Sequence, residues 1–443
     1  AVELTGSMIQ SFKTRQIYSP ISHSAALWEF ELKKSCGFGY SVQSKASALA
    51  LPEVDIELLK FFEYLNTPSP MPLFYTNTQK VENRKKDKPV RTFQSGDMEA
   101  HYSNLRFYYP VLEFMLQQQG KEGWWIGIGG SHVSCNWDLL YNRLNRRGTS
   151  FYASDVSGWD RSLQPFMMNA ACSIMNSLLP QQTQEKYRMA LKNLTTQLIY
   201  APIIMEKGEV LPKIGGMPSG DYRTIMVNSI SNWIKNVYCI LRAMPDVGYV
   251  SIQELRQRLT YFEGSITGDD DLFSFQKDEV KSFINLKTFP DVYRAACSEL
   301  GFSLKVLDMS EKLEDLEYLS RRFVKRYGVW VSVPNWQKIV CALVYGNYRS
   351  NPKYHVLRAL SLRLECWGHP QLFEALDEYC MYLRQVHEDS LDSIQDNLPT
   401  WKEVWTVYLT EPQVKRIHMG QNETGNLKSA TGLELPSFYI PLD

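Results

Sequence analysis

The sequence predicts a mixed α/β protein, of the α+β kind, built from more than one domain. Short apolar or β-branched runs bounded by glycine alternate with helical periodicity between residues 151 and 306. From Trp336 to Tyr408 the periodicity is helical throughout. The chain has 443 residues, which exceeds the size at which a single hydrophobic core usually stops growing. We therefore expect strands and helices in the central region and a helical domain near the C-terminus.

Composition limits the classes of function. Hydrophobic residues make up 44% of the chain, which is enough for a folded core, so we do not expect a disordered protein. Lys and Arg total 48, as do Asp and Glu, so a nucleic-acid-binding surface has to be a local one. The eight cysteines show no zinc-ligand spacing, which indicates free thiols in a reducing compartment. No apolar run is long enough to cross a membrane, so we expect a soluble intracellular protein without a transmembrane segment.

Residues 1–150 mix short apolar runs with many turn-forming residues, which predicts an irregular α/β region. Lys34–Tyr40 is a glycine-bearing loop that is either an ordinary turn or a place where backbone amides approach a phosphate. Gln79–Arg91 carries six basic residues and is either a solvated face or a basic arm for triphosphates or a nucleic-acid backbone. Trp124–Gly130 lacks the third glycine of a dinucleotide-binding motif, so we expect a loop before a helix at 138–147.

Two aspartates follow a short strand in the segment Phe151–Leu163. Asp155 ends the strand, a Ser-Gly pair turns the chain, and Asp160 precedes an amphipathic helix that begins near Phe166. Asp160 is explained either by a functional site or by the preference for an anion in the first turn of a helix. Asp155 has no such local explanation, and a carboxylate at the end of a strand is a common ligand position in α/β proteins.

Gly215–Trp233 predicts a flexible loop that runs into a helix. Thr224, Asn228 and Asn232 recur every four residues and form one polar stripe, although both residue types are weak helix formers. The stripe either faces a ligand or makes hydrogen bonds to a neighbouring helix.

Tyr261–Phe275 predicts a β-hairpin with three adjacent carboxylates at its tip. Two apolar or β-branched runs flank Gly268. A turn at this glycine puts Asp269 and Asp270 at the tip of the hairpin and Asp271 at the edge of the turn. Adjacent carboxylates repel one another unless water, a basic patch or a divalent cation offsets their charge. The segment is therefore either an Asp-rich solvent turn or a site for Mg²⁺ or Mn²⁺.

Downstream of this hairpin the pattern predicts helices, one strand and a second hairpin. The strand covers Phe302–Val306, and the second hairpin pairs 319–324 with 329–333. The polar segment Gly420–Asp443 predicts an extended tail. The expected helices are Val280–Lys287, Asp291–Leu300, Trp336–Tyr345, Tyr354–Trp367, Leu372–Val386 and Trp401–Tyr408.

Three motifs, taken in this order along the chain, resemble those of the RNA-dependent RNA polymerases of positive-strand RNA viruses. They are Asp155-x4-Asp160, Ser219-Gly220-x3-Thr224-x3-Asn228 and Gly268-Asp269-Asp270. The resemblance extends to three further segments. Ser35–Tyr40 resembles a loop of the fingers, and Lys80, Arg84 and Arg91 resemble a basic motif of the NTP tunnel. Leu319–Phe323 resembles a primer-grip hairpin.

Within that family, the residues of two motifs resemble different groups of viruses. Ser154–Asp160 is similar to sobemoviruses and poleroviruses, whereas Gly216–Gly220 is similar to caliciviruses and picornaviruses. The resemblance is therefore to a picornavirus-, calicivirus- or sobemovirus-like polymerase.

The resemblance implies a right-hand polymerase fold, in which the palm is an antiparallel sheet with helices and the thumb is helical. The implied fingers cover 1–148 and an insertion at 201–215. The implied palm covers 149–200, with motif A, and 216–333, with motifs B to E. The thumb and the C-terminal tail then occupy 334–443.

The resemblance also implies a role for each motif residue in nucleotidyl transfer by a two-metal mechanism. Asp155, Asp269 and Asp270 are implied as catalytic residues and as ligands of Mg²⁺, for which Mn²⁺ can substitute. Asp160 is implied to recognise the ribose 2′-hydroxyl through its own hydrogen bonds with Ser219, Thr224 and Asn228. The further implied residues are Ser219, Gly220, Thr224 and Asn228 for ribose selection, Lys80, Arg84 and Arg91 for the triphosphate, and Ser35, Gly37, Tyr40, Arg321 and Arg322 for template and primer.

The implied partners are an RNA template, the nascent RNA and NTPs. Other viral replication proteins or a protein primer are further implied partners. The implied location is a replication complex in the host cell cytoplasm, associated with membranes through those partners.

Two alternatives stay open at this point. A reverse transcriptase is expected to carry a bulky aromatic residue at position 160, where this chain has Asp160. A palm-like RNA-binding or scaffold protein without catalysis has no need for the mutual repulsion of several carboxylates.

Three departures from the family pattern limit the transfer, one of which is that Arg91 is followed by Thr92-Phe93 where an aliphatic pair is usual. Asp271 adds a third acid, which alternation puts on the other face of its strand and which has no assigned role. The lysine expected after the following strand falls near Met309, so only Lys305 and Lys312 are nearby candidates.

Overall fold

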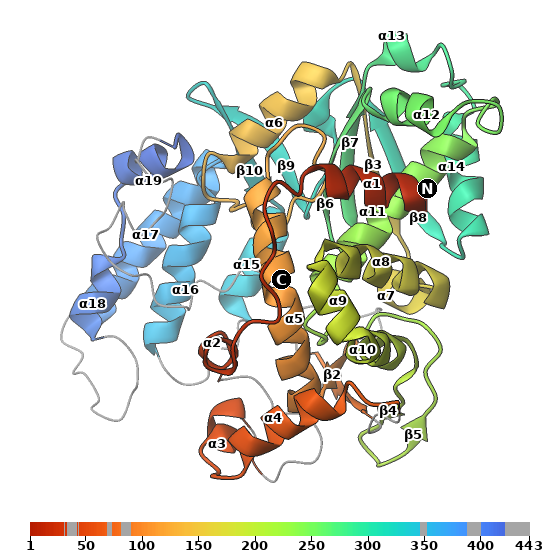
Figure 1. The fold of residues 1–443 in the computed structure, drawn as a ribbon. Coiled ribbons are helices and arrows are strands. Elements are labelled where there is room, and N and C mark those ends of the chain that lie inside the picture. The colour runs from red at the N-terminus through yellow and green to blue at the C-terminus, as the bar shows by residue number, and fades with distance from the viewer. Residues whose placement is uncertain are drawn as a thin grey trace. The chain divides into compact units, whose positions relative to one another are not determined.

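The computed structural model describes residues 1–30, 32, 42, 44–68, 73–80, 90–345, 352–387 and 400–420. Within these residues the chain divides into two compact units, shown as a ribbon in Figure 1. Unit 1 contains the described parts of 1–129 and 147–309, and unit 2 contains those of 130–146 and 310–420. No helix of the described residues is both long and apolar enough to cross a membrane.

A four-stranded sheet forms the centre of unit 1. Its strands lie in the order β6-β7-β3-β8, and β7 pairs antiparallel with both β6 and β3. Most side chains of β3 and β7 are buried, which is why their sequences read as nearly continuous apolar and aromatic runs. The strand bounds are β3 Ser150–Val156, β6 Phe262–Thr267, β7 Asp270–Phe275 and β8 Leu304–Ser310.

Helix α11 (Thr224–Arg242) packs beside this sheet, in contact with β6 and with helices α8 (Pro165–Leu178) and α14 (Phe289–Glu299) (Figure 1). The ring of Tyr152 on β3 stacks on Phe273 of β7, with 5.1 Å between centroids, and contacts α14 edge-on. Large aromatic rings bury much apolar area, so these contacts hold the sheet and helices in one core.

A second sheet of unit 1 joins segments that are far apart in the chain. Its order is β2-β1-β4-β5, with β1 (Tyr75–Gln79) antiparallel to β2 (Thr92–Gly96) and parallel to β4 (Ile203–Ile204). β5 (Val210–Leu211) completes the sheet. The other helices of unit 1 are α1 Val2–Ser11, α2 His23–Trp28, α3 Lys45–Leu49, α4 Val54–Tyr64, α5 Met98–Gln118, α7 Trp159–Ser162, α9 Gln181–Lys186, α10 Arg188–Tyr200, α12 Ile252–Leu259 and α13 Lys277–Val280.

Unit 2 combines a hairpin with a set of helices. Strand β9 (Arg321–Arg326) pairs antiparallel with β10 (Val329–Pro334). Helix α6 (Asn136–Arg147) packs on this hairpin, because Tyr141 stacks on Trp330 with 3.8 Å between centroids. The other helices of unit 2 are α15 Trp336–Val344, α16 Pro352–Glu365, α17 Pro370–Val386, α18 Trp401–Thr406, α19 Glu411–His418 and the 3₁₀ turn Leu313–Asp315.

The mixed α/β class with antiparallel sheets is confirmed, but several predicted element bounds differ and one helix was not predicted. The helix expected at Val280–Lys287 is wrong, because α13 (Lys277–Val280) ends where it was expected to begin and residues 281–288 form turns, in which the Asn285 side chain accepts from the Lys287 backbone N–H. The strand expected at Phe302–Val306 is β8, shifted towards Ser310. Helix α19 was not predicted, although the Thr410 capping box marks its start.

Candidate active site

The tip of the β6–β7 hairpin is fixed by α11. Gly268 has φ 65°, a left-handed conformation that favours glycine, and it lets Thr267 pair with Asp270 across the turn. The Gly268 N–H donates to Ser229 Oγ at 2.9 Å. Asn232 Nδ2 donates to the carbonyl of Gly268 at 3.2 Å and to that of Asp269 at 3.0 Å. The turn therefore presents Asp269 from a backbone that the helix holds on both sides.

The pairing of β3 with β7 brings two further carboxylates to one place. Ser154 pairs with Asp271, so the next residues along the two antiparallel strands, Asp155 and Asp270, adjoin each other. Because side chains alternate along a strand, Asp155 and Asp270 belong to the face opposite Ser154 and Asp271. Lys305 on β8 forms an ion pair with Asp155.

The surroundings of Asp269 raise the pKa of its carboxyl group. Its side chain is exposed at the turn, yet the neighbouring elements remove enough water that lost hydration is the first cause of a raised pKa. The carboxylates of Asp160 and Asp155 raise the pKa further, while its own backbone amide and Arg91 lower it. These three carboxylates and one guanidinium are therefore close enough to affect one another's charge.

The chemistry of these carboxylates suits a divalent cation. Among the described residues, no group of three His, Cys, Asp or Glu side chains is arranged so that it could hold a metal ion. The carboxylates of Asp160 and Asp155 nevertheless lie near enough to Asp269 to add to its raised pKa, and hard oxygen donors are what Mg²⁺ and Mn²⁺ prefer. Asp155 has Lys305 as its cationic partner in this conformation. The residues thus fit a cation, whose full coordination requires a side-chain rearrangement.

Asp160 is held by two of the three residues predicted to surround it. Ser219 Oγ donates to one carboxylate oxygen at 2.7 Å, and Asn228 Nδ2 donates to the other at 3.0 Å. The expected hydrogen bond from Thr224 is wrong. Its hydroxyl donates instead to the carbonyls of Pro218 at 2.8 Å and Asp221 at 2.7 Å, because Thr224 is the first residue of α11 and closes the preceding loop.

Gly220 is required by a close approach of two backbones. Its N–H donates to the Gln94 carbonyl at 2.8 Å, and it bridges to Ser95 of β2. A Cβ at this position would lie 2.5 Å from that carbonyl oxygen, so a side chain cannot be accommodated without a shift of the backbone. Gly220 therefore ties the loop before α11 to the second sheet.

Two of the predicted triphosphate residues are brought together. The Lys80 N–H donates to the Arg91 carbonyl at 2.8 Å, which extends the β1–β2 pairing to these positions. Arg91 is exposed and acts on the pKa of Asp269, so its charge reaches the hairpin tip. Arg84, Ser35, Gly37 and Tyr40 lie outside the described residues.

The two arginines predicted to contact template or primer differ in their surroundings. Arg321 is buried, forms an ion pair with Glu365 of α16 and donates to Ser332 Oγ at 3.4 Å. The Arg321 side chain therefore links β9 to α16 within unit 2, and because it is buried it is not available to RNA. Arg322 points to the other face of β9 and is exposed, so it keeps the predicted role as a proposal.

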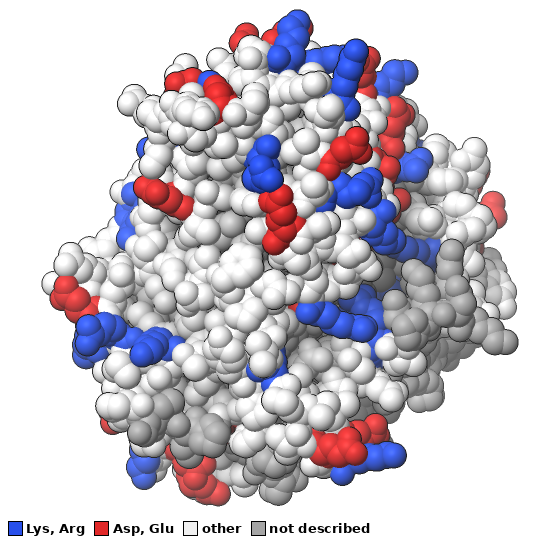
Figure 2. Space-filling model, turned by 90° about the vertical axis from the view of Figure 1, so that its right-hand side faces the viewer, with Lys and Arg blue, Asp and Glu red and all other residues white. Residues whose placement is uncertain are grey.

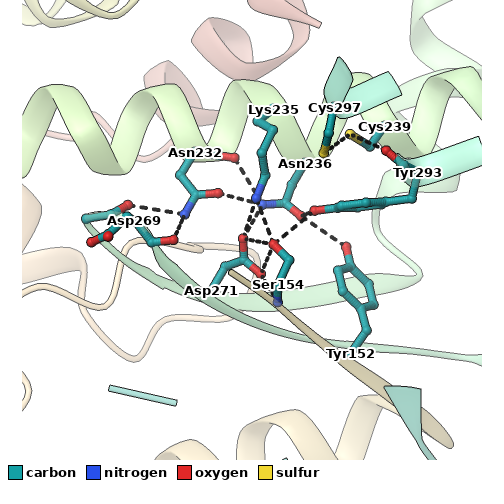
Figure 3. A network of polar contacts seen from close by, with 11 residues as sticks. Tyr152, Ser154, Asn232, Lys235, Asn236, Cys239, Asp269, Asp271, Tyr293 and Cys297 are labelled. Atoms are coloured by element: carbon teal, nitrogen blue, oxygen red, sulfur yellow. Dashed lines mark hydrogen bonds and ion pairs between the residues drawn. The ribbon is translucent and has the colours of Figure 1, made fainter. Parts of the chain in front are cut away.

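A buried polar network behind the hairpin was not predicted (Figure 3). Lys235 Nζ donates to Asp271 at 2.7 Å and to Ser154 Oγ at 2.8 Å, and neither Lys235 nor Asp271 has an exposed side chain. Burial alone would lower the pKa of Lys235, but Asp271 more than offsets this and raises it. The sequence signal was Asn236, which continues the four-residue stripe beside this lysine.

A second buried pair lies at the start of α11. The guanidinium of Arg223 donates to both oxygens of Asp221, at 3.0 and 3.1 Å, and Tyr75 donates to the same carboxylate at 2.8 Å. Burial opposes ionisation of Asp221, but Arg223 lowers its pKa below the ordinary value. The pair connects the loop before α11 to β1.

Charged side chains of both signs lie on the face of the molecule drawn in Figure 2. On the face in Figure 2, basic and acidic side chains are interspersed and do not form one extended patch of a single sign. This distribution agrees with equal totals of 48 basic and 48 acidic residues.

Comparison with known proteins defines the class of the chain. Residues 7–384 match the model of the viral RNA-dependent RNA polymerase family. The chain is 25% identical over 327 residues to the genome polyprotein of Bean yellow mosaic virus, covering 74% of this chain and 10% of that polyprotein. It is 27% identical over 386 residues to that of Zucchini yellow mosaic virus (strain Reunion Island), covering 84% of this chain and 11% of the polyprotein.

The chain belongs to the viral RNA-dependent RNA polymerase family. It is thus an enzyme of the nucleotidyltransferase class by family, as predicted from the three motifs. The chain spans about a tenth of the length of the two polyproteins named above.

Proposed function

We propose that this chain synthesises RNA on an RNA template during viral genome replication. The observation that carries the proposal is the register of β3 with β7, which supports Asp155 and Asp270 at adjoining strand ends beside the turn of Asp269. Lost hydration is the first cause of the raised pKa of Asp269, and the nearby Asp160 and Asp155 add a local excess of negative charge. Such an excess is disfavoured in a folded protein unless a cation is bound there during function.

Mg²⁺, or Mn²⁺ in its place, would supply activation of the RNA 3′-hydroxyl and neutralisation of the pyrophosphate leaving group in a two-metal mechanism. Asp155, Asp269 and Asp270 would hold the cations, from two strands whose pairing fixes their spacing. Lys305 would release Asp155 when this happens. Arg91 and Lys80 would neutralise the triphosphate and orient it towards the hairpin tip, with Arg84 in support.

Asp160 would recognise the ribose of the incoming nucleotide. Ser219 and Asn228 donate to both of its oxygens, so the carboxylate is fixed in position and keeps lone pairs to accept from a 2′-hydroxyl. A deoxynucleotide would leave this half-buried acceptor without its partner, which disfavours a reverse transcriptase. Thr224 and Gly220 would act on the loop that holds Ser219 and not on the ribose.

The wider arrangement is part of the same proposal. The fingers would comprise 1–148 and 201–215, the palm 149–200 and 216–333, and the thumb and tail 334–443. Template and nascent RNA, NTPs and further replication proteins or a protein primer would be its partners in a host cytoplasmic replication complex. The narrower likeness to picornaviruses, caliciviruses and sobemoviruses stays a prediction.

Single-nucleotide incorporation tests the proposal. The purified chain is given a primed RNA template, one NTP and Mg²⁺ or Mn²⁺, and is compared with Asp269→Ala. A matched control is Glu299→Gln, which removes a charge from the exposed ion pair with Arg242 at the far end of α11. Incorporation lost in Asp269→Ala and kept in the control is expected. Equal incorporation by all three proteins overturns the metal assignment. Chelator-insensitive RNA binding without any incorporation favours a non-catalytic scaffold.

A further inference from the structure

The third acid of the hairpin takes part in a buried ion pair that stability alone does not explain. Lys235 and Asp271 are withdrawn from water completely. Taking two charges out of water is so unfavourable that a well-packed apolar pair is often as stable or more stable. Their presence in this core therefore calls for a role that apolar residues of similar volume would not perform.

The pair joins the two strands that carry the proposed metal ligands. Ser154 donates its backbone N–H to Asp271 Oδ1 at 3.0 Å and its hydroxyl to Oδ2 at 2.7 Å. Ser154 directly precedes Asp155, and Asp271 directly follows Asp270. The network thus clamps β3 to β7 at the positions next to both carboxylates, from the opposite face of the sheet.

The same network reaches the turn that presents Asp269 (Figure 3). Asn236 Nδ2 donates to Asp271 at 3.2 Å and to Asn232 Oδ1 at 2.9 Å. Asn232 in turn donates to the carbonyl of Asp269 at 3.0 Å. A continuous chain of hydrogen bonds therefore runs from the ion pair along α11 to the hairpin tip.

We propose that Lys235 and Asp271 are positioning residues that set the relative placement of Asp155, Asp269 and Asp270 for cation binding. This inference rests on the proposed function, and it gives Asp271 a part in the site without making it a ligand. Supporting residues behind metal ligands commonly control metal affinity in this way, because they restrict the orientation of the side chains that coordinate the metal.

The test replaces the ion pair by apolar residues in the double variant Lys235→Met/Asp271→Leu. Binding of Mn²⁺ alone is measured by electron paramagnetic resonance without RNA or nucleotide, and single-nucleotide incorporation is measured separately. We expect a folded variant with about tenfold weaker Mn²⁺ binding and a kcat lowered by about a hundredfold, as for other residues that support ligands. The KM for NTP should change by less than about threefold, because Arg91 and Asp160 are untouched.

Two further variants keep the inference falsifiable. Ser154→Ala removes one hydroxyl but keeps the charge pair, so it folds even if the double variant does not, and about tenfold losses in Mn²⁺ binding and kcat are expected. Glu299→Gln serves as the control, because Glu299 lies on α14 and pairs with Arg242 at the far end of α11, and it should match the native chain in every measurement. Native Mn²⁺ affinity and native kcat in a folded double variant overturn the positioning role. If the double variant does not fold, the same result in Ser154→Ala overturns it.

The two proposals fail in different ways. A native chain whose Mn²⁺ binding depends on Asp269 but which incorporates no nucleotide overturns the proposed function, and the Mn²⁺ titration of the double variant still decides the positioning role. A native chain that polymerises alongside an equally active, folded double variant overturns the positioning role alone.

Discussion

The ammonium group of Lys305 on β8 is ion-paired with the carboxylate of Asp155 at the end of β3. The side chains are 58% and 45% exposed, so water weakens the pair and its contribution to stability is at most about 1 kcal/mol. The main effect of the pair is therefore that the positive charge of Lys305 offsets the negative charge of Asp155.

Lys305→Met should make Mn²⁺ bind more tightly to the protein alone, by up to about fivefold, because a cation no longer competes for Asp155. Electron paramagnetic resonance titration without nucleotide measures this. The control is Lys312→Met, since the exposed Lys312 is a lysine of the same region without an ion pair to Asp155. Weaker Mn²⁺ binding in Lys305→Met would show instead that the lysine orients Asp155.

Asp160→Ala should lower the preference for ribonucleotides over deoxynucleotides by about tenfold or more, because one hydrogen bond to a charged acceptor is lost. The ratio of kcat/KM for CTP and dCTP, measured on the same RNA template, gives the discrimination. Thr224→Ser is the matched control, since it keeps the hydroxyl that donates to Pro218 and Asp221. A native ratio in Asp160→Ala would remove this residue from sugar selection.

Asp269→Asn should stabilise the metal-free protein at neutral pH. The folded state raises the pKa of Asp269, so it holds the proton more strongly than the unfolded state, and stability falls as the pH rises through the folded pKa. The variant removes this loss. Its melting temperature in EDTA should exceed that of the native chain at pH 7, and the gap should close towards pH 4.

Added Mn²⁺ separates this effect from a general change in packing. The cation should raise the melting temperature of the native chain more than that of Asp269→Asn, because it binds the ionised carboxylate. A variant that melts below the native chain in EDTA at pH 7 would contradict the electrostatic account.

His418 should make unit 2 sensitive to acid. Burial lowers the pKa of His418 to about 4, and Arg326 and Arg321 add to this effect against a hydrogen bond to the Leu364 carbonyl. The unfolded chain takes up the proton near pH 6.5, so the free energy of unfolding should fall by roughly 3 kcal/mol between pH 6.5 and 4.

His418→Gln removes the titrating group and should flatten this part of the pH dependence. Urea unfolding followed by tryptophan fluorescence is suited to the measurement, because the His418 ring stacks on Trp367 with 4.8 Å between centroids. An equally steep acid loss in the variant would place the responsible group elsewhere.

Residues at sharp turns could be placed from the sequence. Gly158 and Gly268 mark the turns beside Asp155 and Asp269, and both adopt the left-handed conformation that glycine favours. Local chain chemistry therefore sufficed to locate the strand ends. A spacing of four residues also predicts that Asn228 and Asn232 lie on one side of α11, where they contact Asp160 and the hairpin.

The sequence does not predict the role of a residue when that role depends on which face of its helix or strand packs against another element. Lys235 sits one position before Asn236, and only the packing of α11 against the sheet decides that both meet Asp271. Arg321 and Arg322 alternate on β9, and the sequence does not tell which one turns towards Glu365. The resemblance implies a hydrogen bond from Thr224 to Asp160, but the backbone carbonyls of the preceding loop are the partners of its hydroxyl.

The parallel pairing of β1 with β4 imposes an order on folding. Tyr75 aligns with Ile203, so β1 and β2 remain a two-stranded hairpin until the chain has been synthesised beyond α10. Such a hairpin is marginal in water and has an open edge. At cellular synthesis rates this exposure lasts on the order of ten seconds. The middle of the chain therefore determines when the N-terminal sheet becomes stable, and a product that ends before Ile203 would expose an unpaired β1 edge.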